Sequence, residues 1–433
     1  MLLDFCGHSW RARLATILSL SFLVVASIPH TVVLRYALLA LFFILNVSHS
    51  STLKEAWQEQ FWPVVLLGSF LSFAALHCSI WALWPAYAWH EWRTQLLIGG
   101  LWFIAGLLLF RRRSGPSILD LTIIAGSTLA LLELFYTMYA WYSTGRWPYG
   151  QTFLTSTKLE FSFYMNLVFT FVMTAFCFSH SKAKPVTCLP RWGLAVIAVF
   201  ILLLSLKTGA RNGMISLIYI LFSLLALFIF FKRLYLNWRT ASSIITLILI
   251  LTGFSSYALV QDPRNQHFIE SARLGWQYIQ STAWLGIEPI PKTSGGNIVD
   301  ESIYLRVSWI HSGLDLIIAH PLGYGYGRGA FTKALTASAK VNHVGHSHSA
   351  MIDLGVGLGV LGVLLWLAFC CYLVVKGFRV FAARGEVLGL ALMLVSCGFV
   401  GRMLLESVQR DHMLYLFLFT TAALLAEMRA RAG

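Results

Sequence analysis

The sequence predicts an all-α membrane protein of about 12 transmembrane helices with one large external loop that contains amphipathic helices. Of its 433 residues, 58% are hydrophobic and 12% are charged, which is more apolar side chain than a soluble chain of this length covers with polar surface. The apolar residues form continuous runs rather than the short alternating segments of a β-barrel. We therefore expect the spans to be helices.

Twelve apolar runs approach the roughly 20 residues that a spanning helix needs. They cover residues 14–29, 31–47, 62–80, 95–110, 118–142, 160–178, 191–207, 213–231, 241–260, 349–375, 386–405 and 412–428. The first run follows Arg11 and Arg13, as a signal peptide would, but it leads almost directly into the second run and lacks a well-placed small-x-small cleavage site. We expect it to be a retained helix.

The distribution of Lys and Arg predicts the orientation of these helices. Arg111, Arg112 and Arg113 fall in one short loop, and Arg429 and Arg431 fall in the C-terminal tail, as in the cytoplasmic segments of other membrane proteins. Both termini are then cytoplasmic. The expected division is 1–260 with helices 1–9, 261–348 as the external loop domain and 349–433 with helices 10–12.

Basic residues also occur on the expected external side, where positive charge works against the orientation signal. Arg146, Lys207, Arg211 and Arg410 fall in or beside short external loops, and Arg306 falls in the long one. Guanidinium groups bind phosphate through paired hydrogen bonds, so this collection favours an anionic ligand. For any single residue of the set, the alternative is a side chain that reaches the lipid headgroups.

The long loop contains a helix signal. Ile303, Val307, Ile310, Leu314 and Ile317 are spaced by 4, 3, 4 and 3 residues, which puts them on one helical face. A helix of about 17 residues with charges on its other side is typical of an interfacial helix that lies on the bundle. Arg306 would sit at the border of that face, and its stem would be buried there.

Residues 320–331 follow this helix and alternate glycine with other residues. Four glycines in alternation predict a tight loop, because glycine adopts dihedral angles closed to other residues. Glycine-rich loops can hold phosphate, but this one lacks the Lys-Ser/Thr ending of a nucleotide loop and does not follow a strand. A nucleotide site is therefore not indicated.

A histidine-rich segment ends the external loop. His343, His346 and His348 precede an apolar helix that starts at about Ala350, with Ser349 or Ser347 as its cap. We favour proton transfer or recognition of a sugar or phosphate over a metal site, since Asp353 is the nearest acid and is expected below the membrane surface. The other acids that could act as bases or as partners of the arginines are Glu160, Glu301, Glu406 and Asp411.

Three of these segments together resemble the O-antigen ligase and polymerase superfamily. The family's Ser/Thr-Gly-x-Arg-x-Gly turn is similar to residues 208–213 here, which include Arg211. Its loop arginine before His-Pro-Leu-Gly-x-Gly-x-Gly resembles Arg306 and residues 320–327. Its His-x-His-Asn element resembles residues 346–349, with Ser349 in place of Asn. The likeness covers mainly residues 200–370 and the layout of spans around them.

The resemblance implies a GT-C-like glycosyltransferase in the inner membrane of a Gram-negative bacterium, with its active site facing the periplasm and with no metal or other cofactor. The implied donor is O-antigen on undecaprenyl diphosphate, and the implied acceptor is a sugar of lipid A-core oligosaccharide. Arg211 and Arg306 would bind the diphosphate, supported by Lys207, Arg146 and Arg410. His348, with His346 as the second choice, would orient or deprotonate the acceptor hydroxyl.

Three alternative functions stay open at this point. An O-antigen polymerase and an O-linked protein oligosaccharyltransferase belong to the same superfamily and use the same kind of donor. A lipid-linked glycan transporter belongs to another class, in which repeated halves and mid-membrane charges are expected. We find no convincing repeat in the sequence, and the informative charges gather at one face. Nucleic acid is not an expected partner.

Overall fold

The structure is a computed structural model of the chain. It describes residues 10–47, 58–111, 115–178, 187–230, scattered positions between 242 and 253, and 267–432 apart from 294, 297, 298, 339 and 342. The regular secondary structure of these residues consists of helices, with no β-strand among them. The predicted all-α class is therefore confirmed for the described part of the chain.

Most of the expected spans are present as helices. The bundle helices are α2 (Trp10–Val25), α3 (Val32–Val47), α5 (Phe61–Ile80), α6 (Pro85–Glu91), the π-helix η1 (Trp92–Leu97), α7 (Ile98–Phe110), α8 (Ile118–Thr144), α9 (Lys158–Phe178), α10 (Arg191–Thr208), α11 (Arg211–Phe230), α16 (Ala350–Arg384), α17 (Val387–Leu405) and α18 (Asp411–Ala432). Within the described residues, eight helical segments are long and apolar enough to span a membrane. Shorter apolar segments in α2, α3 and α11 coincide with three further expected runs, whereas the run 241–260 falls mainly outside the described residues.

The centre of the bundle is formed by α9 and α18. Their most apolar windows are 94% and 89% buried within the protein, which distinguishes them from helices that face lipid along one side. Helix α18 packs along α7, and Gly106 of α7 makes this approach possible, because a Cβ there would lie 2.5 Å from the carbonyl oxygen of Phe419. Phe399 of α17 stacks on Phe417 of α18 with centroids 3.9 Å apart. Close helix packing and stacked rings thus hold this core.

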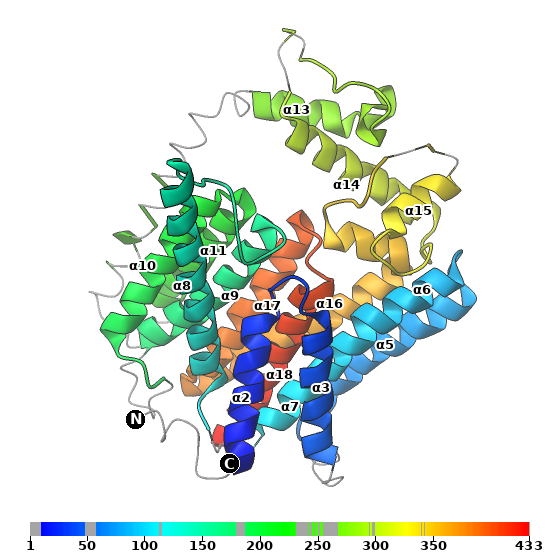
Figure 1. Cartoon of the computed structure of the whole chain (residues 1–433). Coiled ribbons are helices and arrows are strands. Elements are labelled where there is room, and N and C mark those ends of the chain that lie inside the picture. Colours follow the sequence, from blue (N-terminus) through cyan, green and yellow to red (C-terminus); the bar gives the residue numbers. More distant parts are fainter. Residues whose placement is uncertain are drawn as a thin grey trace.

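The segment before α16 forms a cap at one end of the bundle (Figure 1). It contains α13 (Phe268–Trp276), α14 (Glu301–Ala319), α15 (Ala330–Ala337) and the short helices η3 (Tyr278–Gln280) and η4 (Ala283–Leu285). Helix α2 begins, and α18 ends, at the opposite end of the bundle (Figure 1). This arrangement agrees with two termini on one side of the membrane and a large loop on the other. Which side is cytoplasmic stays a prediction from the charge distribution.

Helix α14 confirms the expected loop helix but not the face that it buries. Its fully buried residues include Tyr304, Ser308 and Ser312, whereas Leu314 of the apolar stripe is 40% exposed. Small residues explain the difference, because they let neighbouring backbones approach closely. A Cβ on Gly275 of α13, for example, would lie 2.5 Å from the carbonyl oxygen of Tyr304. The buried face is therefore set by close packing rather than by the most apolar stripe.

The glycine loop, residues 320–329, is joined by its backbone to α16. The N–H groups of Tyr324 and Gly325 donate to the carbonyls of Val356 and Gly357 at 2.8 and 2.9 Å. Helix α16 is broken at Gly359, which has a φ of 69°, a conformation that favours glycine. The predicted tight loop is present over residues 320–329, whereas the last two residues of the predicted range, Ala330 and Phe331, begin α15. The bonds of the loop to the break fix the first half of α16 beside the cap.

Candidate active site

The histidine pair, His346 and His348, lies at the entrance to α16. Of the two caps predicted for this helix, Ser349 and Ser347, the structure has Ser349. Its Oγ accepts a hydrogen bond from the N–H of Ile352 at 3.4 Å. The two imidazole rings have centroids 4.0 Å apart, and the ring of His348 also stacks on Trp309 of α14 at 5.1 Å. His348 has a φ of 58°, an uncommon conformation for a residue with a side chain. The surrounding contacts therefore hold its ring in one place.

Both histidines are kept neutral by their surroundings. Burial lowers the pKa of His346 to about 4, and the charge of Arg410 adds to this effect. Burial also lowers the pKa of His348 to about 4, with further contributions from His346, Arg306 and Arg410. A neutral imidazole has one ring nitrogen with a lone pair. Near neutral pH each ring can therefore accept a proton from a hydroxyl group.

Arg306 and Arg410 flank the histidine pair from two different parts of the fold. Arg306 belongs to α14, one helical turn before Trp309, and Arg410 precedes α18. Both side chains are half-buried, and among the residues that the structure describes no carboxylate lies within 4 Å of either guanidinium. Two cations without carboxylate partners beside neutral bases form a site suited to an anion.

Arg211 reaches the same helix from the bundle. It begins α11, and its Nη1 lies 3.4 Å from Oδ2 of Asp300. Asp300 caps α14, because its Oδ1 accepts from the N–H of Ile303 at 3.2 Å. The side chain of Arg211 is 45% exposed, so this ion pair leaves it accessible to a ligand. The two arginines singled out by the sequence are thus connected through the start of α14.

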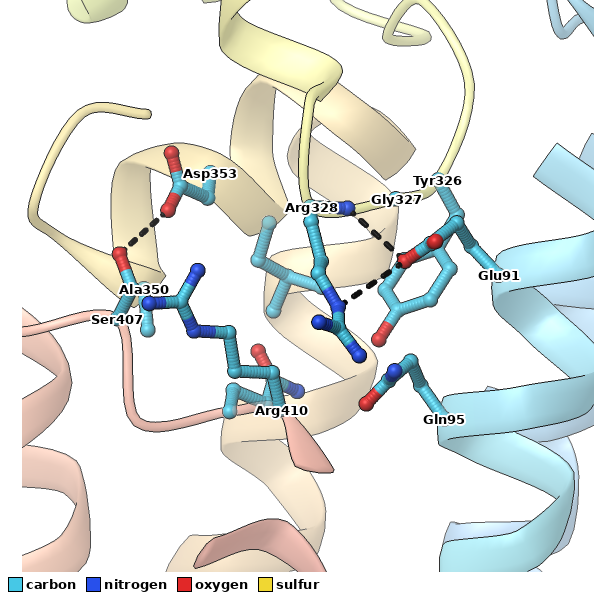
Figure 2. A pocket seen from close by; sticks show the side chains of 11 residues that line it. Glu91, Gln95, Tyr326, Gly327, Arg328, Ala350, Asp353, Ser407 and Arg410 are labelled. Atoms are coloured by element: carbon cyan, nitrogen blue, oxygen red, sulfur yellow. Dashed lines mark hydrogen bonds and ion pairs between the residues drawn. The ribbon is translucent and has the colours of Figure 1, made fainter. Parts of the chain in front are cut away.

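A pocket extends from Arg410 to the glycine loop (Figure 2). Arg410 enters it from the connection between α17 and α18, and Arg328 enters it from the glycine loop (Figure 2). Asp353 lies on its wall and accepts hydrogen bonds from the hydroxyls of Ser347 and Ser407, both at 2.7 Å. This carboxylate therefore ties the histidine loop to the α17–α18 connection.

Asp353, Trp309 and Ser407 are site residues that sequence reasoning did not assign. A single acid in the first turn of a long apolar helix was a usable signal for Asp353. The spacing of three residues between Arg306 and Trp309 puts both on one face of α14, which was a signal for Trp309. Ser407 had no such signal, because its bond to Asp353 spans 54 positions of the sequence.

Lys207 and Arg146 lie in other surroundings. The ammonium of Lys207 is buried, 2.9 Å from Oε1 of Glu133 and 2.9 Å from the carbonyl oxygen of Gln151. Its charge is thus already balanced inside the protein. Arg146 is exposed just beyond the end of α8, a helix that packs mainly on α2 and α9. Neither residue is joined to the histidine pair by a contact that the described residues show.

The acids named as alternative bases have partners of their own. Glu406 is buried and pairs with Arg402 at 2.5 Å, and Asp411 pairs with Arg328. Glu160 accepts from the N–H of Ser156 at 3.1 Å, and Glu301 is exposed in the first turn of α14. Within the described part of the chain, no three His, Cys, Asp or Glu residues are grouped so as to hold a metal ion.

Comparison with known proteins identifies the segment that carries this site. Residues 193–367 match the family model described as O-Antigen ligase, and they include Arg211, Arg306 and the histidine pair. No curated protein matches the chain. Members of the matched family transfer lipid-linked glycans. The chain therefore carries an O-antigen ligase family domain over residues 193–367.

Proposed function

We propose that the protein is an O-antigen ligase. It transfers O-antigen from undecaprenyl diphosphate to an outer-core sugar of lipid A-core at the periplasmic face and so completes lipopolysaccharide. The observation that carries this proposal is the neutral histidine pair with Arg306 and Arg410 beside it. In this proposal residues 261–348 form the periplasmic domain over the spans of 1–260 and 349–433.

The diphosphate of the donor is bound by Arg306 and Arg211 in the proposed reaction. Arg306 lies beside His348, and Arg211 is connected to the same helix through Asp300. The bond between the sugar C1 and the diphosphate oxygen breaks, and its electron pair leaves with the diphosphate. Fixed guanidinium groups stabilise this developing charge without a divalent ion. Arg410 adds a further positive charge near the diphosphate, because it lies close enough to both histidines to lower the pKa of each.

The acceptor hydroxyl is handled by His348. Its oxygen forms the new bond to the sugar C1, while its proton moves to the neutral ring of His348. We prefer His348 to His346 because Trp309 holds its ring and Arg306 adjoins it. His346, whose ring centroid lies 4.0 Å from that of His348, packs against it. No step requires a metal, so we expect transfer to continue undiminished in the presence of a chelator.

Deletion of the gene followed by analysis of the cell's glycolipids tests the proposed function. A ligase predicts bare lipid A-core together with long polymer retained on the lipid carrier. Core that carries a single repeat unit indicates an O-antigen polymerase, and loss of glycan from secreted proteins indicates an O-linked oligosaccharyltransferase. Polymer retained on the cytoplasmic face indicates a transporter. Unchanged lipopolysaccharide contradicts both the ligase and the polymerase.

A further inference from the structure

A second cavity adjoins the pocket of Figure 2 and has no role in the proposed reaction. It has a volume of about 340 Å³ and shares Glu91, Gln95 and Arg328 with that pocket. The rest of its lining comes from α3, α6, η1 and α18: Val32, Arg35, Tyr36, His90, Thr94, Asp411 and Tyr415. It therefore lies where these helices meet the glycine loop.

Arg35 is a buried positive charge in this cavity. Its residue is 7% exposed, and its Nε has no hydrogen-bond partner. No carboxylate within the described residues lies within 4 Å of its guanidinium. The nearby Asp411 is already engaged, since Arg328 pairs with it and the amide of Gln95 donates to its Oδ1 at 3.3 Å. Asp411 and Glu160 attract this guanidinium only from a distance, and a buried guanidinium without a carboxylate in direct contact is costly. An anion in the cavity would offset that cost.

The position of Arg35 indicates what kind of anion would fit. It lies in the first turn of α3, whose neighbouring residues Val32 and Val33 are 48% and 81% exposed. Exposed apolar residues beside a buried cation, at the end of a membrane helix, are suited to a molecule with a hydrocarbon tail and an anionic head. Tyr36 and Tyr415 line the same cavity. The hydroxyl of Tyr415 already donates to the carbonyl oxygen of Thr94, so of the two it is Tyr36 that can donate to such a head.

We propose that Arg35 binds the phosphoryl group of a membrane lipid in this cavity. The site is separate from Arg211 and Arg306, which line neither cavity, and it shares Arg328 with the pocket that Arg410 also lines. The tail of the lipid runs along the exposed side of α3. Binding of a lipid here does not require glycan transfer, so the lipid site and the proposed reaction can each be tested without the other.

Binding is tested on the purified, delipidated full chain by native mass spectrometry, without donor or acceptor. The probes are undecaprenyl phosphate, phosphatidylglycerol and inorganic phosphate. Arg35→Ala is expected to weaken lipid binding by about tenfold or more, as befits a lost charge-assisted hydrogen bond. The matched control is Arg93→Ala, because Arg93 is exposed on η1 and does not line the cavity. Equal binding by the wild type and Arg35→Ala would overturn the proposal.

The three probes distinguish the source of the phosphate. A preference for undecaprenyl phosphate assigns the site to the polyprenyl carrier, and equal binding of phosphatidylglycerol assigns it to membrane phospholipid. Binding of inorganic phosphate as tight as that of either lipid contradicts a lipid site. If Arg35→Ala does not fold, phenylglyoxal labelling of the wild type decides the matter. A bound lipid phosphate should protect Arg35 but not Arg93, and equal labelling of Arg35 with and without lipid overturns the proposal.

Discussion

The buried ion pair between Lys207 and Glu133 offers a test of what Lys207 does. Their side chains are 3% and 0% exposed, and Nζ lies 2.9 Å from Oε1. Glu133 also accepts from the backbone N–H groups of Phe153 and Leu154 at 3.0 and 3.2 Å. Lys207→Met leaves this carboxylate buried without its cation. Breaking a buried pair from one side costs about 3–5 kcal/mol of the free energy of unfolding.

The double variant separates a structural role from a ligand-binding role. In Lys207→Met with Glu133→Gln, the amide of residue 133 keeps an oxygen for the N–H of Phe153 and carries no charge that needs a buried cation. It should therefore recover most of the lost stability, since a neutral replacement for a buried pair is often harmless. Equilibrium unfolding in mixed detergent micelles measures each free energy. The reasoning is refuted if Lys207→Met unfolds like the wild type but binds the lipid-linked donor more weakly.

Three further predictions follow from the site and the loop that supports it. Because both His346 and His348 have pKa values of about 4, transfer activity should be level from pH 8 to about 5. It should fall only through pH 4, where the rings take up protons. A fall centred near the ordinary histidine pKa of about 6.5 would contradict this prediction. Trp309→Leu removes the stack on His348 and should lower kcat by about tenfold to a hundredfold without weakening donor binding; an unchanged kcat would show that the stack does not position the ring. Gly359→Ala would force alanine into a φ of 69° and put its Cβ 2.1 Å from the carbonyl oxygen of Pro321. It should therefore lower the free energy of unfolding by at least about 1–3 kcal/mol. Gly401→Ala is the control, because a Cβ at Gly401 meets open space, and an equal effect of the two substitutions would contradict the prediction.

Helix positions were predictable from the sequence because lipid imposes a strong requirement on each span separately. A helix in lipid must satisfy its own backbone and present apolar side chains, so runs such as 160–178 and 386–405 marked α9 and α17 closely. The face that α14 buries was not predictable in this way. It depends on Gly275 of another helix, and an apolar stripe carries no information about that neighbour.

The candidate site was predictable where its residues form local motifs. Arg306 and the histidine pair stand in two separate motifs of the same predicted loop, and the structure brings them together with Arg410. The burial of Lys207 was not visible, because Glu133 is 74 residues away. The same holds for Arg35, whose missing partner becomes apparent only when α3, η1 and α18 are assembled around it.

Transfer by the purified full chain tests the central claim, which is that Arg306 and His348 act directly on the donor diphosphate and the acceptor hydroxyl. The assay supplies a lipid-diphosphate-linked glycan and lipid A-core, and compares Arg306→Ala and His348→Ala with the control Arg93→Ala. We predict that kcat falls by about a hundredfold or more in each site variant, while folding and the control stay normal. Transfer at the wild-type rate by either folded site variant would contradict the assignment.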